Sequence, residues 1–110
     1  MARLGRGILY LTVKPTGALA ANTFVGFDGN TCALNTKALG ATDFAFSAGD
    51  LADVITKGTA IVKVGAVAVA VGDKLTSDAA GLAIAGGANP INGFALEAGN
   101  PGDLIEVSLI

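Results

Sequence analysis

Apolar segments with a period of two residues, each closed by turn residues, account for most of the chain. Glycine, proline, asparagine and aspartate recur about every eight to twelve residues, which is typical of all-β sandwiches and barrels. Because no segment has the periodicity of an amphipathic helix, the pattern predicts an all-β fold. Strands are expected at residues 8–13, 23–27, 31–34, 53–64, 82–85, 91–97 and 104–110, with a short alternating segment around Phe44 and Phe46.

Residues 66–71 have the strictest alternation in the sequence, with valine and alanine taking turns. The period of two residues and the flanking Gly65 and Gly72 favour a strand over a helix. Such a strand has a bulky valine face and a flat alanine face, and the flat face suits close packing against another sheet or subunit. Residues 76–81 and 86–90 are predicted to be loops.

A Gly-Asp pair precedes a predicted strand at three places, in residues 48–51, 71–75 and 101–104. Glycine lets the chain bend, and the aspartate can accept hydrogen bonds from nearby backbone N–H groups before the strand begins. The spacings between the three sites are unequal. The pattern therefore indicates three similar turns and not a sequence repeat.

The composition indicates one domain with an unusual core. Hydrophobic residues make up 52% of the 110 residues, but aromatic residues only 5%, and tryptophan is absent. Small side chains each bury little area, so we expect a marginal monomer whose apolar surface is partly covered by other chains. We expect an N-terminal arm at residues 1–7 and a single β-domain at residues 8–110.

Charge and hydropathy exclude several partners. The seven Lys and Arg residues are dispersed and the net charge is −2, so no basic cluster is present that could neutralise a nucleic acid backbone or hold an anionic membrane. The apolar stretch at residues 8–13 is shorter than a signal peptide core, and no apolar run is long enough to span a bilayer. We therefore expect the chain to be made and kept in cytosol-like conditions.

Candidate chemistry is sparse. The sequence contains no histidine, which removes the commonest general base and metal ligand. Cys32 is the only cysteine, and we expect it to be a small buried hydrophobe. Asp50 with Asp53, or Asp73 with Asp78, could hold calcium, but such pairs are usually turn formers. A glycosidase pair among the nine acidic residues stays open, although only one tyrosine and no tryptophan are present to stack on a sugar. We predict no enzymatic activity, no metal and no cofactor.

A carrier domain is an alternative. Residues 71–75 look like the Val-x-x-Gly-Asp-x-Leu pattern of lipoyl and biotinyl domains, in which a lysine on a hairpin is the attachment point. Here Lys74 lies within the Gly-Asp turn itself, and the sequence has no Met-Lys-Met or Asp-Lys-Ala hairpin.

Several segments in order resemble one protein family. These segments are Thr23–Gly29, Ala38–Asp43, Ala48–Asp50, Lys57–Val62, Val71–Gly81, Gly93–Ala98 and Gly102–Val107. Taken together, the chain from about residue 20 onwards resembles the small decoration (cement) proteins of tailed-bacteriophage capsids.

The resemblance implies a small β-barrel or β-sandwich-like (β-tulip-like) domain that is made in the host cytoplasm and binds the outside of a phage capsid. It implies the major capsid protein and the chain itself as partners, as a homotrimer or a dimer, and stabilisation of the head. Another minor virion component, such as a head fibre base or a tail part, stays open. We expect capsid contacts at Arg3 and Arg6 of the arm and at Gly86, Gly87, Asn89 and Pro90 of the glycine-rich loop.

Overall fold

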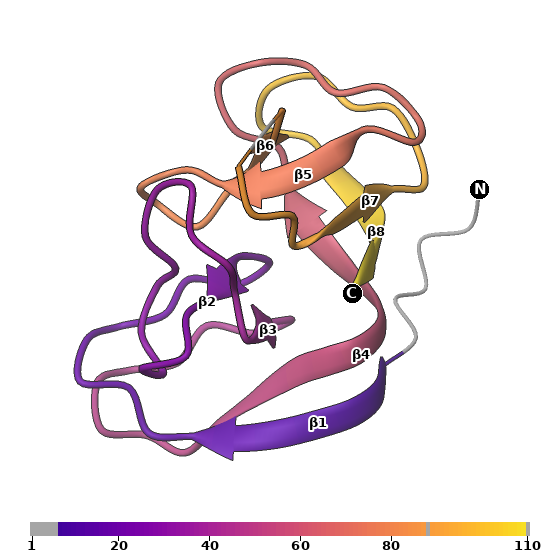
Figure 1. The fold of residues 1–110 in the computed structure, drawn as a ribbon. Helices are drawn as coiled ribbons and strands as arrows, with labels where there is room; N and C mark the ends of the chain where they lie inside the picture. Colours follow the sequence, from indigo (N-terminus) through magenta and orange to yellow (C-terminus); the bar gives the residue numbers. More distant parts are fainter. Residues whose placement is uncertain (1–6, 88, 110) are drawn as a thin grey trace.

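Eight β-strands form the regular structure of the computed structural model, which describes residues 7–87 and 89–109 (Figure 1). Within these residues there is no helix, and the all-β prediction is confirmed. The strands are β1 (Gly7–Val13), β2 (Phe24–Val25), β3 (Gly40–Ala41), β4 (Ala52–Lys63), β5 (Lys74–Ser77), β6 (Ala83–Ala85), β7 (Gly93–Ala95) and β8 (Leu104–Leu109).

One antiparallel sheet contains all of these strands, in the order β2-β3-β4-β8-β7-β5-β6, with β1 paired to β4. The long strand β4 runs through both halves of the molecule (Figure 1): up to Gly58 it pairs with β1 and β3, and from Thr59 it pairs with β8. At the far ends of the sheet, the Phe24 N–H donates to the Gly81 carbonyl oxygen at 2.7 Å. The sheet is therefore a nearly closed, small barrel, as expected.

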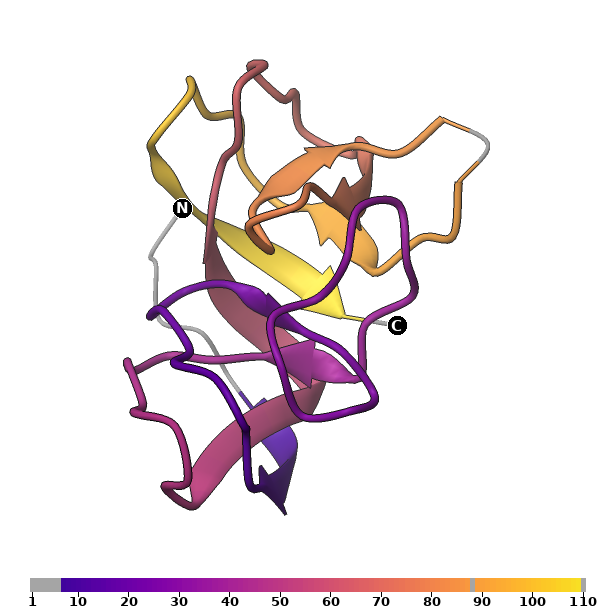
Figure 2. The same ribbon diagram turned by 90° about the vertical axis from the view of Figure 1, so that its left-hand side faces the viewer.

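The two halves that share β4 have the same plan. The first consists of β1, β2, β3 and the start of β4, and the second repeats it with the end of β4, β5, β7 and β8. In each half, the last strand pairs with the first strand and with a short third strand. Figures 1 and 2 show the two halves at opposite ends of β4. The fold is thus an internal structural duplication.

In each half of the molecule, two loops are joined to one another by an isolated backbone bridge. An isolated backbone bridge joins Leu19 to Phe46 in the first half, and another joins Val69 to Gly99 in the second. Each bridged residue is followed three positions later by a residue with positive φ, namely Asn22, Gly49, Gly72 and Gly102.

The Gly-Asp turns follow directly on these bridges and are confirmed. The Oδ2 atoms of Asp50, Asp73 and Asp103 each accept the backbone N–H of the residue three positions earlier, at 2.8–3.0 Å. Their unequal spacing has a simple cause: Asp50 and Asp103 belong to equivalent loops, whereas Asp73 follows the other loop of the second half.

The predicted strand at residues 66–71 is wrong. This segment is a loop in which only Val69 forms a bridge and is buried, while Val67 and Val71 are 65% and 67% exposed. The alternation reflects one anchored side chain between two solvent-facing ones, and the alanines are exposed rather than packed against another sheet.

Three other strand predictions need correction. Residues 76 and 77, predicted as loop, are the buried end of β5, because they pair with β6. Residues 31–34 form a single bridge at Thr31, and the two-residue strand β3 was not predicted.

The core is built mainly of small and β-branched side chains around Phe24, Leu75 and Ile105, which are fully buried. A second cluster lies under the first half, where Leu19, Val25, Ala52 and Val54 pack together. The radius of gyration of 12.2 Å is close to the roughly 13 Å of a single compact domain of this length.

Substitutions at two buried threonines are expected to change the free energy of unfolding in opposite directions. The Thr76 hydroxyl is fully buried and has no hydrogen-bond partner among the described residues, whereas the Thr42 hydroxyl donates to the Ala20 carbonyl oxygen at 2.8 Å. We expect Thr76→Val to raise the free energy of unfolding by about 1 kcal/mol and Thr42→Val to lower it by about 1–2 kcal/mol, because only the second change breaks a buried hydrogen bond. Urea unfolding checks both, and a loss of stability in Thr76→Val would contradict the assignment.

Candidate functional site

Large apolar side chains are unusually exposed along the edge strand β1 and in the loops. On β1, Leu9 and Leu11 lie on one face and Tyr10 on the other, and all three are more than 40% exposed. Contiguous exposed apolar surface marks interaction sites in many proteins. The other exposed large apolar residues are Phe27, Leu34, Phe44, Leu51, Val67, Val71 and Leu104.

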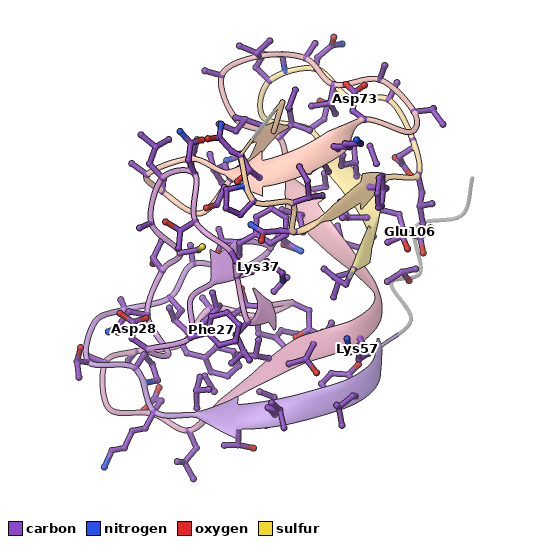
Figure 3. All side chains as sticks on the ribbon, in the orientation of Figure 1. Phe27, Asp28, Lys37, Lys57, Asp73 and Glu106 are labelled. Atoms are coloured by element: carbon purple, nitrogen blue, oxygen red, sulfur yellow. The ribbon has the colours of Figure 1, made fainter. Side chains whose placement is uncertain are left out.

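One face of β1 forms a wall of a groove of about 420 Å³. The groove lies in the first half of the molecule, between β1 and the segment of residues 27–39, and Figure 3 shows Phe27, Lys37 and Lys57 around this region. A volume of this size is in the range of sites that bind small ligands or a few side chains. Its lining residues are Leu9, Leu11, Phe27, Lys37, Ala38, Leu39, Thr56 and Lys57.

Among the described residues of that lining, Lys37 and Lys57 are charged and none is acidic. The Lys37 ammonium donates to the Ala38 carbonyl oxygen at 2.8 Å. Burial, and after it the nearby positive charge of Lys57, hold the pKa of Lys37 below its usual range. Lys37 and Lys57 therefore lie near one another on this surface.

A tight turn presents Phe27 at the rim of the groove. The Asn30 N–H donates to the Asp28 carboxylate at 3.0 Å, and Gly29 takes a φ of 83°, which glycine adopts without strain. The Asn30 side chain also accepts the Thr16 N–H at 2.9 Å, which fixes the turn to the preceding loop. Phe27 is 70% exposed on this rigid support.

The opposite wall, at residues 37–39, is held by the second half of the molecule. The buried Asn92 accepts the Ala38 N–H at 2.7 Å and donates to the Thr36 carbonyl oxygen at 3.1 Å. The Leu39 N–H donates to Val25 of β2 at 2.8 Å. Hydrogen bonds within the domain therefore hold both the turn that carries Phe27 and the wall at residues 37–39.

The described residues that are expected to contact the capsid do not line the groove. Arg3 and Arg6 are outside the described residues. Of the glycine-rich loop, Gly86 is buried, and a Cβ there would meet the Ile91 Cδ1 at 2.7 Å. Gly87, Asn89 and Pro90 are exposed, so they stay available for contact. None of the four loop residues lines the groove.

Sequence reasoning missed the groove. It treated residues 8–13 as an ordinary strand, although every residue from Ile8 to Leu11 is apolar, whereas a strand with one solvent-facing side alternates. That unbroken apolar run was the available signal. A second signal was Phe27, which directly precedes the turn residues Asp28 and Gly29, because a large aromatic residue at a turn is seldom buried.

The remaining candidates for chemistry serve the fold. Cys32 is buried, it accepts the Ser77 hydroxyl at 3.2 Å, and burial raises the pKa of its thiol. Among residues 7–87 and 89–109, no three His, Cys, Asp or Glu side chains gather where they could hold a metal ion. Asp78 and Asp53 accept hydrogen bonds from Leu82 and Thr12, respectively.

The geometry does not favour the carrier alternative. Lys74 is the first residue of β5 and pairs with Phe94 of β7, so it does not lie at a hairpin tip.

The described part of the chain has no helix of the length and apolarity needed to cross a membrane.

A family model for phage cement proteins matches residues 3–109, nearly the whole chain. The chain belongs to the phage cement protein family. This cement-family chain is accordingly a structural protein of the phage virion. No curated protein sequence matches it.

Among solved structures, the fold of this cement-family chain is similar to the crystal structure of the head fibre gp8.5 N base of bacteriophage phi29. The match has a TM-score of 0.75 and covers 93% of each chain, at 18% sequence identity. A likeness at this identity concerns the fold, and it agrees with the barrel-shaped sheet described above.

Proposed function

We propose that this protein binds the outer surface of the phage capsid and cements neighbouring major capsid subunits, which stabilises the head. The observation that carries the proposal is the match of the phage cement family over residues 3–109. The exposed apolar side chains of β1 and of the loops support it, because a binding protein needs such surface and a monomer in water does not.

The mechanism is additive burial of surface. Each copy buries a modest area across a boundary between capsid subunits, and many copies on one shell add their contributions. In this proposal the chain also associates with itself, because a homotrimer at three-fold positions, or a dimer at two-fold positions, engages several capsid subunits at once. In this proposal the protein acts by binding alone, in agreement with a sequence that has no histidine.

Mixing the purified chain with heads of its own phage that lack it, followed by sedimentation, tests the proposal. We expect binding that saturates at a fixed ratio to the major capsid protein and heads that withstand higher temperature before releasing DNA. Deletion of residues 1–6 is expected to weaken attachment while the thermal unfolding of the free domain stays unchanged, because the arm supplies Arg3 and Arg6. Heads that neither bind the chain nor gain stability would refute the cementing role.

The base of a head fibre is a second candidate function. It is favoured by the likeness to the phi29 head fibre N base. The same sedimentation experiment separates the two roles, because a fibre base also has to bind a second, fibrous protein. Cementing predicts that the chain alone protects the heads.

A further inference from the structure

The strand β1 has a free edge. It pairs with β4, and Figures 1 and 2 show it as the outermost strand of the first half. Among the described residues, no backbone–backbone hydrogen bond outside the β1–β4 ladder involves residues 8–13. Native proteins usually protect such an edge with charged residues or proline, because it can pair with another chain. Residues 8–13 contain neither, so the sequence leaves this edge open to pairing.

The pairing of β4 shows which backbone groups of β1 point outward. A Cβ at Gly40 would meet the Ile55 carbonyl oxygen, so this oxygen points toward β3. In an antiparallel sheet such a residue does not exchange hydrogen bonds with the residue opposite it on the other side, which here is Tyr10. The N–H and C=O of Tyr10, and those of Thr12 two positions later, therefore point away from β4. The Leu9 carbonyl oxygen, by contrast, accepts a hydroxyl of β4 at 3.2 Å.

We propose that a second copy of the chain adds to this edge, so that the two β1 strands pair antiparallel about a two-fold axis at Leu11. The proposal locates the self-association that is part of the proposed function, and it rests on that function to this extent. Tyr10 of each copy lies opposite Thr12 of the other, and each of these pairs exchanges N–H···O=C hydrogen bonds through the outward backbone groups. Leu9 lies opposite Val13, and the Leu11 residues of the two copies face each other.

The side chains along this edge are complementary to themselves. The Thr12 hydroxyl donates to the exposed Asp53 carboxylate, on the β4 residue opposite it, at 3.0 Å. The two-fold axis at Leu11 brings the phenol of Tyr10 from each copy beside the Thr12–Asp53 pair of the other, where its hydroxyl can donate to the carboxylate. An axis at Tyr10 would instead place the two phenols opposite each other. On the other face, Leu9 and Leu11 of the two copies cover one another.

A second copy also fits this edge better than an unrelated strand. The segment of residues 8–13 carries no charge, so it does not select a charged partner. A second copy supplies a strand of the same length and the same apolar character. The two-fold axis uses the free edge of both strands at once, so the pair is closed and adds no further chains. An unprotected edge is therefore compatible with a soluble assembly.

Disulfide formation at the axis tests the register. Two Leu11 residues that face each other form a non-hydrogen-bonded pair, whose Cα atoms lie about 4.5 Å apart, within the span of a disulfide. Under mild oxidation we expect Leu11→Cys to form covalent dimers and Leu9→Cys to form few. The natural Cys32 is buried, and we expect it not to contribute. Equal cross-linking of the two variants would overturn the proposed register.

Sedimentation equilibrium over a range of concentrations tests the association itself. We expect the unaltered chain to have the mass of two copies. Leu11→Lys is expected to raise the dissociation constant by about tenfold or more, because two ammonium groups then meet at the axis. Val67→Lys is the matched control: Val67 is 65% exposed in a loop of the second half, and we expect a change of less than about twofold. Thermal unfolding of both variants verifies that the domain is intact.

The outcomes separate this pairing from the cementing role. A chain that stays single at every concentration, or that assembles in threes, would overturn the pairing, because a two-fold axis joins two copies. If such a chain still binds heads that lack the protein, cementing stands without the pairing. If Leu11→Lys then loses head binding, the edge takes a strand of the capsid protein instead. A dimer that does not bind heads would support the pairing and refute the proposed function.

Discussion

Gly40→Ala is expected to abolish stable folding. A Cβ atom at Gly40 would overlap the carbonyl oxygen of Ile55, the β4 residue that pairs with Ala41. The oxygen belongs to the backbone of the central strand and cannot rotate away, so β3 has to separate from β4. We expect the free energy of unfolding to fall by at least about 3 kcal/mol, a large part of the stability of a small domain.

Because of the internal duplication, an equivalent substitution can be made in the second half of the molecule. Gly93 lies at the equivalent place in the second half, where a Cβ would come within 2.5 Å of the Ser108 carbonyl oxygen of β8. Gly93→Ala is therefore expected to have a similarly large effect. Gly17→Ala is the control, because nothing lies within 4 Å of a Cβ at Gly17. Urea unfolding in which Gly40→Ala matches Gly17→Ala would contradict the close approach of β3 to β4.

Phe24→Ala is expected to be the most damaging truncation of an aromatic side chain. Phe24 has no exposed surface and lies in the main core cluster, among side chains that are mostly small and cannot expand to fill the space. Removing its ring loses the transfer free energy and leaves a cavity, at a cost of about 3–5 kcal/mol.

Phe44→Ala is the matched control for that truncation. Phe44 is 67% exposed, so its loss removes little buried area and should change the unfolding midpoint only slightly. Chemical denaturation of the two variants, side by side, checks the difference. Equal destabilisation would show that Phe24 is not the centre of the core.

The fold class and the long elements were accessible from the sequence because they are encoded locally. The β-branched stretch at residues 53–64 matches β4 at residues 52–63, and the Gly-Asp turns have the expected hydrogen bonds. The two-residue strands β2 and β3 have too few residues to show a period. The strand predicted at residues 66–71 was wrong for a physical reason: a loop in which one valine points inward has the same local alternation as a strand.

The structural duplication is also visible in the sequence, as a similarity between two segments. Residues 49–54 read Gly-Asp-Leu-Ala-Asp-Val, and residues 102–107 read Gly-Asp-Leu-Ile-Glu-Val. These segments enter β4 and β8, the last strands of the two halves. The similarity of these two segments is not apparent when the three Gly-Asp turns are considered together. The turn at Asp73 follows a loop that is not equivalent to the loops before Asp50 and Asp103.

The candidate groove could not be assembled from the sequence. Its residues come from β1, from the turn at Phe27, from residues 37–39 and from β4, and only the long-range pairing of β1 with β4 brings them together. Lysines dispersed along the sequence gave no sign that two of them share one surface. The expected contact residues of the arm and of the glycine-rich loop stay predictions.

The sharing of β4 has a consequence for how the chain folds. Since one strand closes the first unit and opens the second, neither unit is complete without residues of the other, and a fragment that ends in β4 leaves one of them unpaired. Most pairings also join residues distant in the sequence, which makes such topologies slow to fold. We therefore expect the chain to fold in one cooperative step, and to meet its partner as a folded domain rather than as a segment that becomes ordered on binding.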